Sequence, residues 1–117
     1  MVAALVALGL AAPAQAGQDA DACTNYGCAG MGSWYGDGDQ IVVCDLEADG
    51  WSVVVIAWLN GVRASNKWHT AGAGSCSTRS YGDLPEGMEV KFQACLGKYS
   101  SETGDINRCG KPGAGRA

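Results

Sequence analysis

The stretch WSVVVIAWL, residues 51–59, is the longest apolar run after the first sixteen residues, and it decides the fold class. It is rich in β-branched residues and lies between the dipeptides DG (49–50) and NG (60–61). β-Branched side chains favour strands, and these two dipeptides favour tight turns. The pattern therefore predicts a central β-strand rather than a helix, with a hairpin turn at either end.

The residues around this run also favour strands. Apolar and polar residues alternate from Met88 to Cys95, with Val90 and Phe92 on the apolar side. A period of two is typical of a half-buried antiparallel strand. Further short strands are expected at residues 41–44, 62–68, 76–81 and 106–109. With glycine-rich turns between them, the sequence predicts an all-β chain that folds as a small antiparallel β-sandwich or barrel.

The two ends of the chain carry different signals. Residues 1–16 are almost wholly apolar and end in AQA (14–16), which is typical of a secretion signal that is cleaved on export. Residues 17–38 are expected to form an irregular N-terminal arm, residues 39–110 the β-sandwich domain, and residues 111–117 a frayed tail. No later apolar run reaches the length of a membrane span. A secreted, extracellular protein with no membrane partner is therefore expected.

Six cysteines follow the secretion signal. They are Cys23, Cys28, Cys44, Cys76, Cys95 and Cys109. An even number of cysteines in a small exported chain indicates a disulfide framework rather than metal ligands or reactive thiols. Sequence alone leaves the pairing open, but the expected strand order favours Cys23 with Cys28, Cys44 with Cys76, and Cys95 with Cys109.

The composition argues against several kinds of partner. The formal net charge of −4 disfavours nucleic acid, because phosphate binding needs a basic surface. Zinc is not expected, because His69 is the sole histidine and no CxxC pair is present. The acidic segment 45–50 resembles the opening of a calcium loop, yet the twelfth position is Ile56 where such a loop needs a glutamate. We therefore expect neither a metal nor a cofactor.

The motifs of common hydrolases are also missing. His69 is the one candidate for a general base near neutral pH, and no GxSxG nucleophile motif accompanies it. Clustered carboxylates between Asp37 and Asp49 offer a glycosidase-like alternative, but a domain this small rarely forms the deep cleft that such an enzyme needs. The chain is therefore expected not to be an enzyme.

Aromatic residues are the better candidates for a binding role. Trp34 and Tyr35 lie in a glycine-rich polar segment, and Trp68 lies within NKWH (66–69). Aromatic side chains of this kind serve as exposed anchors for a protein or a carbohydrate. The alternative interpretation is that they cover the open ends of the sandwich.

Several turn and strand-end motifs give the chain a familiar pattern. They are WYGDGD (34–39), ADG (48–50), GAGSC (72–76), EGM (86–88) and ACLG (94–97). Between about residues 34 and 110 the chain resembles small secreted actinobacterial proteins. It is similar in size, export and layout to adaptor subunits of umbrella toxin particles, which link a lectin-like subunit to a long central protein. The resemblance implies a scaffold, and by analogy an adaptor.

Three classes of function follow from these observations. The first is a secreted, non-enzymatic module that binds an extracellular protein, with carbohydrate as a further ligand to consider. The second is a secreted inhibitor or antimicrobial protein that presents a rigid loop between cross-linked strands. The third, a small hydrolase, is the least supported, because the motifs that would carry its chemistry are missing.

Overall fold

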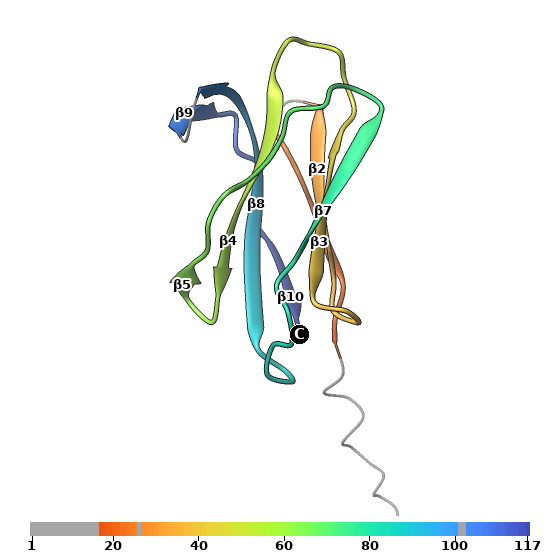
Figure 1. Cartoon of the computed structure of the whole chain (residues 1–117), viewed down its shortest axis with the longest axis vertical. Coiled ribbons are helices and arrows are strands. Elements are labelled where there is room, and N and C mark those ends of the chain that lie inside the picture. The colour runs from red at the N-terminus through yellow and green to blue at the C-terminus, as the bar shows by residue number, and fades with distance from the viewer. Residues whose placement is uncertain (1–16, 26, 101–102) are drawn as a thin grey trace, which may run out of the picture.

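The computed structural model describes residues 17–25, 27–100 and 103–117, which form an all-β fold of two facing antiparallel sheets (Figure 1). The first sheet contains, in spatial order, β1 (Ala20–Cys23), β2 (Gly30–Tyr35), β3 (Gln40–Asp45) and β7 (Ser75–Ser80). The second contains β10 (Gly113–Arg116), β8 (Glu89–Ser100), β4 (Ser52–Leu59) and β5 (Val62–Arg63). In the second sheet β6 (Lys67–His69) also pairs with β4, and β9 (Thr103–Asn107) pairs with β8. The predicted all-β, disulfide-stabilised class is confirmed, and the predicted secretion signal at 1–16 lies outside the described residues.

The run that predicts the fold class is the central strand of the second sheet. β4 pairs with β8 along its whole length and also with β5 and β6. Val53, Val55 and Ala57 are buried in the core between the sheets. Asn60 and Gly61 have φ angles of 51° and 83°, as the predicted tight turn into β5 requires.

The predicted hairpin turn at 48–50 is wrong, because this segment leads from β3 in one sheet to β4 in the other. Its loop is held by its own side chains. The Glu47 N–H donates to Asp45 Oδ1 at 3.2 Å, and the Trp51 N–H donates to Asp49 Oδ1 at 2.9 Å. β3 and β4 each bury an apolar face in the common core, so they lie in opposite layers rather than side by side.

The segment predicted to be an irregular arm contains two strands of the first sheet. Trp34, on β2, is fully buried in the core. The glycines of β2 allow this arrangement, because a Cβ on Gly32 would lie 2.8 Å from the side chain of Val55 and one on Gly30 would lie 2.4 Å from Val53. The irregular arm was predicted because glycine has a low strand propensity. In the fold, however, the glycines of β2 leave space for the larger side chains of the facing sheet.

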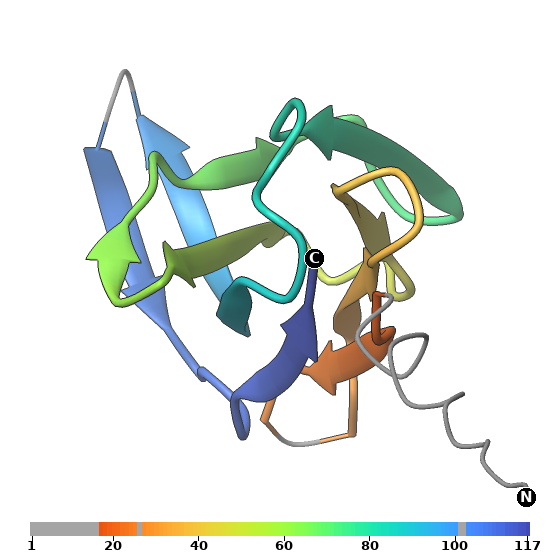
Figure 2. The same cartoon turned by 90° about the horizontal axis from the view of Figure 1, so that it is seen from below.

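The residues predicted to fray at the C-terminus also belong to the fold. β10 pairs with β8, and Ala117 is buried. The Gln18 N–H donates to Arg116 O at 2.9 Å, and the Arg116 N–H donates to Gln18 O at 3.0 Å. β10 therefore lies beside β1 and joins the two sheets along one side, which we call the closed seam (Figure 2). The tail prediction fails because its glycines fit closely against aromatic rings, with a Cβ on Gly115 only 2.5 Å from Trp34.

Three disulfides cross-link neighbouring segments of the fold. They join Cys23 to Cys28, Cys44 to Cys76, and Cys95 to Cys109, which is the pairing that the strand order favoured. The second links β3 to β7, and the third links β8 to the segment after β9. Such a framework is typical of extracellular proteins. Within the described ranges, no helix is long and apolar enough to cross a membrane.

Candidate functional site: the Trp68 groove on the open seam

On another side of the sandwich, no strand pairing joins the two sheets among the described residues. β6 of the second sheet lies against β7 of the first. Within the described residues β6 pairs only with β4, and β7 pairs only with β3. Each strand therefore has one edge without a ladder partner along this side. We call this side, between β6 and β7, the open seam.

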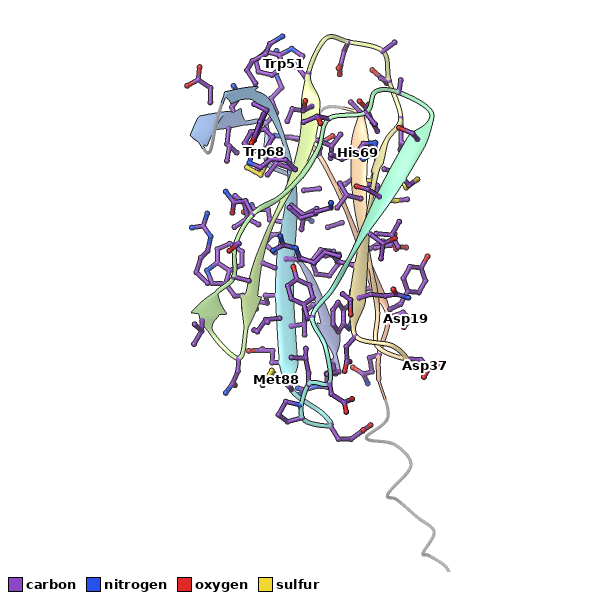
Figure 3. The ribbon with its side chains drawn as sticks, viewed as in Figure 1. Asp19, Asp37, Trp51, Trp68, His69 and Met88 are labelled. Atoms are coloured by element: carbon purple, nitrogen blue, oxygen red, sulfur yellow. A yellow bond between two sulfur atoms is a disulfide. The ribbon has the colours of Figure 1, made fainter. Side chains whose placement is uncertain are left out.

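His69 bridges the open seam from within. Its side chain is 3% exposed and lies between the sheets, and its two ring nitrogens contact Ser75 and Ser77 of β7 (Figure 3). Ser75 Oγ donates its single proton to Gly72 O at 2.6 Å. His69 Nε2–H therefore donates to Ser75 Oγ at 2.8 Å, and in the neutral imidazole Nδ1 accepts the proton of Ser77 Oγ at 2.9 Å.

This arrangement suits a structural role better than a catalytic one. In a hydrolytic triad, the ring nitrogen remote from the serine is held by a carboxylate. In this protein that position is taken by the Ser75 hydroxyl. The sequence singled out His69 as a candidate general base, and the fold uses it as a hydrogen-bonded link between the two sheets.

A groove at the open seam includes Trp68 in its lining. It has a volume of about 290 Å³. Its lining residues come from three separate parts of the chain and are Asn66, Lys67, Trp68, Thr70, Arg79 and Tyr99. We call it the Trp68 groove. Its lining includes Trp, Tyr and Arg, which are residue types enriched in protein interfaces.

The indole of Trp68 is held firmly in place. A Cβ on Gly97 would lie 2.7 Å from Trp68 Cη2, and one on Gly104 would lie 3.2 Å from the same atom. The indole therefore packs directly on the backbone of the β8–β9 hairpin. Its ring also makes an edge contact with Tyr99, with 5.2 Å between the centroids. Tyr99 remains 51% exposed, so the pair forms a fixed aromatic surface that solvent can reach.

The two cations of the groove are without acidic partners in the part of the chain that the structure describes. Lys67, from β6, makes no ion pair with a described residue. Arg79 Nη1 donates to Ser65 O at 3.3 Å, which draws the guanidinium from β7 across the open seam. The remaining N–H groups of Arg79 have no described acceptor. Among the described residues, the lining of the groove is therefore positively charged, in a chain of net charge −4.

A larger hollow, of about 380 Å³, lies beside Trp51 at the same end of the molecule (Figure 3). Several polar groups in or beside it already have partners within the chain. The carboxylates of Asp45 and Asp49 accept loop N–H groups, and Lys98 Nζ donates to Gly50 O at 2.6 Å. Lys98 also lies over the Trp51 ring, 4.5 Å from its centroid. Since these groups already have partners, the Trp68 groove is the better candidate for a ligand.

Tyr81 lies just beyond β7 and packs against Trp34, with 6.1 Å between the ring centroids. Its hydroxyl is buried and has no hydrogen-bond partner among the described residues. Burial raises the pKa of Tyr81 above its ordinary value of 10.0, and the positive charge of Arg79 partly offsets this rise. The phenol is therefore held in its neutral form on folding.

The predicted binding residues have separate positions. Trp34 is 0% exposed, so the prediction that it serves as a surface anchor is wrong; its Nε1–H instead donates to Arg116 O at 3.1 Å, beside the closed seam. Tyr35 is 43% exposed, but β2 is two strands away from β7 in the sheet, so Tyr35 is not part of the groove. Trp68 is half-buried and lines the groove.

Sequence reasoning missed the other five residues of the groove, among them its two cations and its second aromatic ring: Lys67, Arg79 and Tyr99. Arg79 and Tyr99 are distant from Trp68 in sequence and reach it only through the strand order. Lys67 adjoins Trp68 in the NKWH segment, and a cation next to an aromatic residue was the signal that the sequence offered.

Comparisons with known proteins identify no relative. No protein-family model matches the chain, and no match is found among curated proteins or among solved structures.

Proposed function

We propose that this chain is a secreted, non-enzymatic module that binds an extracellular protein through the Trp68 groove. The observation that carries the proposal is the fixed Trp68–Tyr99 pair, which solvent reaches and which Arg79 flanks. Tryptophan, tyrosine and arginine are the residue types that most often dominate the energy of protein interfaces. An anchor that is already held in its bound position loses little conformational entropy on binding.

The remainder of the fold supports a scaffold rather than a catalyst. Three disulfides and the closed seam hold the sheets, while the strand edges at the open seam have no ladder partner among the described residues. Strand edges are a common means of attaching a partner chain. The disulfides also support export to an oxidising compartment. A module of this kind would serve as an adaptor, as the resemblance noted from the sequence implies.

Capture from the culture medium tests this proposal. Tagged chains starting at Gly17 are added to medium of the producing organism, recovered, and analysed by mass spectrometry. The variants are Trp68→Ala and, as a matched control, Trp58→Ala. Trp58 is another half-buried tryptophan of the second sheet and lies beneath Arg63, with 5.6 Å between the guanidinium carbon and the ring centroid.

The proposal requires one partner protein that the wild type and Trp58→Ala recover and that Trp68→Ala does not. Near-ultraviolet circular dichroism establishes that each variant is folded. Equal recovery of the same partner by all three chains would place the binding surface elsewhere. Recovery of no protein by any of them would count against a protein-binding module.

A further inference from the structure

We propose that the segment that occupies the Trp68 groove is an extended, acidic stretch of the partner protein, which lies along the open seam. This inference rests on the proposed function and assigns the chemistry of its ligand. Three features of the described residues lead to it: the charge of the groove, the strand edges beside it, and the position of its aromatic pair.

The charge of the groove favours a ligand with carboxylates. Lys67 and Arg79 both line it, neither pairs with an acidic residue of the described chain, and no acidic residue is among the lining residues. Apart from the hydrogen bond from Arg79 Nη1 to Ser65 O, the N–H donors of Arg79 have no acceptor among the described residues. A guanidinium in this state binds a carboxylate with two parallel hydrogen bonds.

The strand edges favour an extended polypeptide over a compact ligand. β6 and β7 each have one edge without a ladder partner within the described ranges, and these strands contribute Lys67, Trp68 and Arg79 to the groove. A peptide added along such an edge forms main-chain hydrogen bonds, and its alternate side chains point to the same face. A sugar ring uses the aromatic surface but not the backbone edges.

The aromatic pair gives such a segment a fixed position. Trp68 packs on the backbone at Gly97 and Gly104, so one side of its ring is covered by the protein. Tyr99 meets it edge-on and stays exposed. Lys67 and Trp68 are successive residues of β6 and point to opposite sides of the second sheet, so a segment whose acidic side chains reach Lys67 and Arg79 would meet the rings where it crosses the edge of β6. Contact with these rings adds area without further ordering of their side chains.

Two matched peptides test the inference directly. The acetylated and amidated peptide EGEGEGEG and its neutral counterpart QGQGQGQG are titrated into the nitrogen-15-labelled chain that starts at Gly17. The readout is the indole N–H signal of Trp68 and the backbone signals of β6 and β7. The proposal predicts that the glutamate peptide shifts these signals, that the glutamine peptide does not, and that added salt weakens the effect.

The variants are Lys67→Gln, alone and with Arg79→Gln, and the control is Lys111→Gln, whose exposed side chain lies outside the groove. We expect the double variant to bind the glutamate peptide at least about tenfold more weakly, and the control to bind it as the wild type does. The single variant keeps the test valid if the double variant fails to fold, because Lys67 makes no described ion pair and its loss should still weaken binding.

Other outcomes would overturn the inference. Equal shifts with both peptides would show that charge plays no part, and shifts confined to another surface would place the ligand elsewhere. Binding of trigalacturonate without binding of the glutamate peptide would assign the groove to an acidic glycan. If capture from the medium depends on Trp68 while the glutamate peptide causes no shift, the protein-binding function stands and the acidic segment is wrong.

Discussion

The indole of Trp68 lies on the backbone of Gly97, so closely that a Cβ on this glycine would be 2.7 Å from Trp68 Cη2. The two residues belong to different strands of the second sheet, β6 and β8, which both flank β4. Their contact turns a half-buried tryptophan into a fixed part of the Trp68 groove. The geometry of the proposed binding surface therefore depends on a position that has no side chain.

Replacement of Gly97 by alanine tests this dependence. The new methyl group would also lie 2.5 Å from the backbone oxygen of Asp105, so both the indole and the β8–β9 hairpin must shift. We expect a loss of about 1–3 kcal/mol in the free energy of unfolding, typical of an overpacked site. Denaturant unfolding measures it, and a changed near-ultraviolet signal reports the moved indole. An unchanged midpoint would contradict the packing described.

The hydrogen-bonded link at His69 leads to a second prediction. His69→Ala removes both contacts with β7, so the Ser77 hydroxyl loses its acceptor, while Ser75 keeps its hydrogen bond to Gly72 O. We expect the free energy of unfolding to fall by about 1–3 kcal/mol, because the variant loses two hydrogen bonds and the packing of a buried ring. The matched control is Thr78→Ala, an exposed position of the same strand, which should change the midpoint little. Equal free energies of unfolding for the two variants would contradict a stabilising role of His69 at the open seam.

A chain that ends at Pro112 tests the closed seam. It lacks β10, the hydrogen bond from Trp34 Nε1–H to Arg116 O, and the cover that β10 provides beside Trp34. We expect its free energy of unfolding to be lower by at least about 2 kcal/mol. Ala114→Ser, an exposed change within β10, serves as the control. If the truncated chain were as stable as the full one, the prediction that residues 111–117 fray would be correct after all.

The buried phenol of Tyr81 gives a prediction about alkaline pH. Because its pKa is raised in the folded chain, the unfolded chain ionises first, so stability is retained below pH of about 10 and declines as pH rises through the folded pKa. Tyr81→Phe removes this decline, and it also removes a hydroxyl without a described partner, so it should not destabilise the chain at neutral pH. Melting temperatures between neutral pH and pH 11 compare the two chains. A parallel decline in both would refute the assignment.

Strands rich in apolar residues could be predicted from the sequence, whereas the glycine-rich strands could not. β4 and β8 follow from β-branched content and from strict alternation. β2 and β10 are rich in glycine, and their structure depends on large side chains elsewhere in the chain. A Cβ on Gly113 would lie 2.8 Å from the ring of Phe92, so this glycine is matched to a residue that lies far from it in sequence. Local propensity cannot report such a match.

The candidate site was predictable only in part, for a related reason. Trp68 and its neighbour Lys67 are adjacent, so the sequence displays an aromatic beside a cation. Arg79 and Tyr99 enter through the pairing of β7 with β3 and of β8 with β4. Trp34 looked exposed because polar and glycine residues surround it in the sequence, yet the alternation of β2 directs its side chain into the core.

The affinity of the captured partner for three chains tests the central claim most directly. Calorimetric titration compares the wild type with Trp68→Ala and Trp58→Ala. If the Trp68 groove is the binding surface, Trp68→Ala should weaken binding by about 2 kcal/mol or more, roughly thirtyfold, whereas Trp58→Ala should bind as the wild type does. Equal affinity of the wild type and Trp68→Ala would contradict the claim.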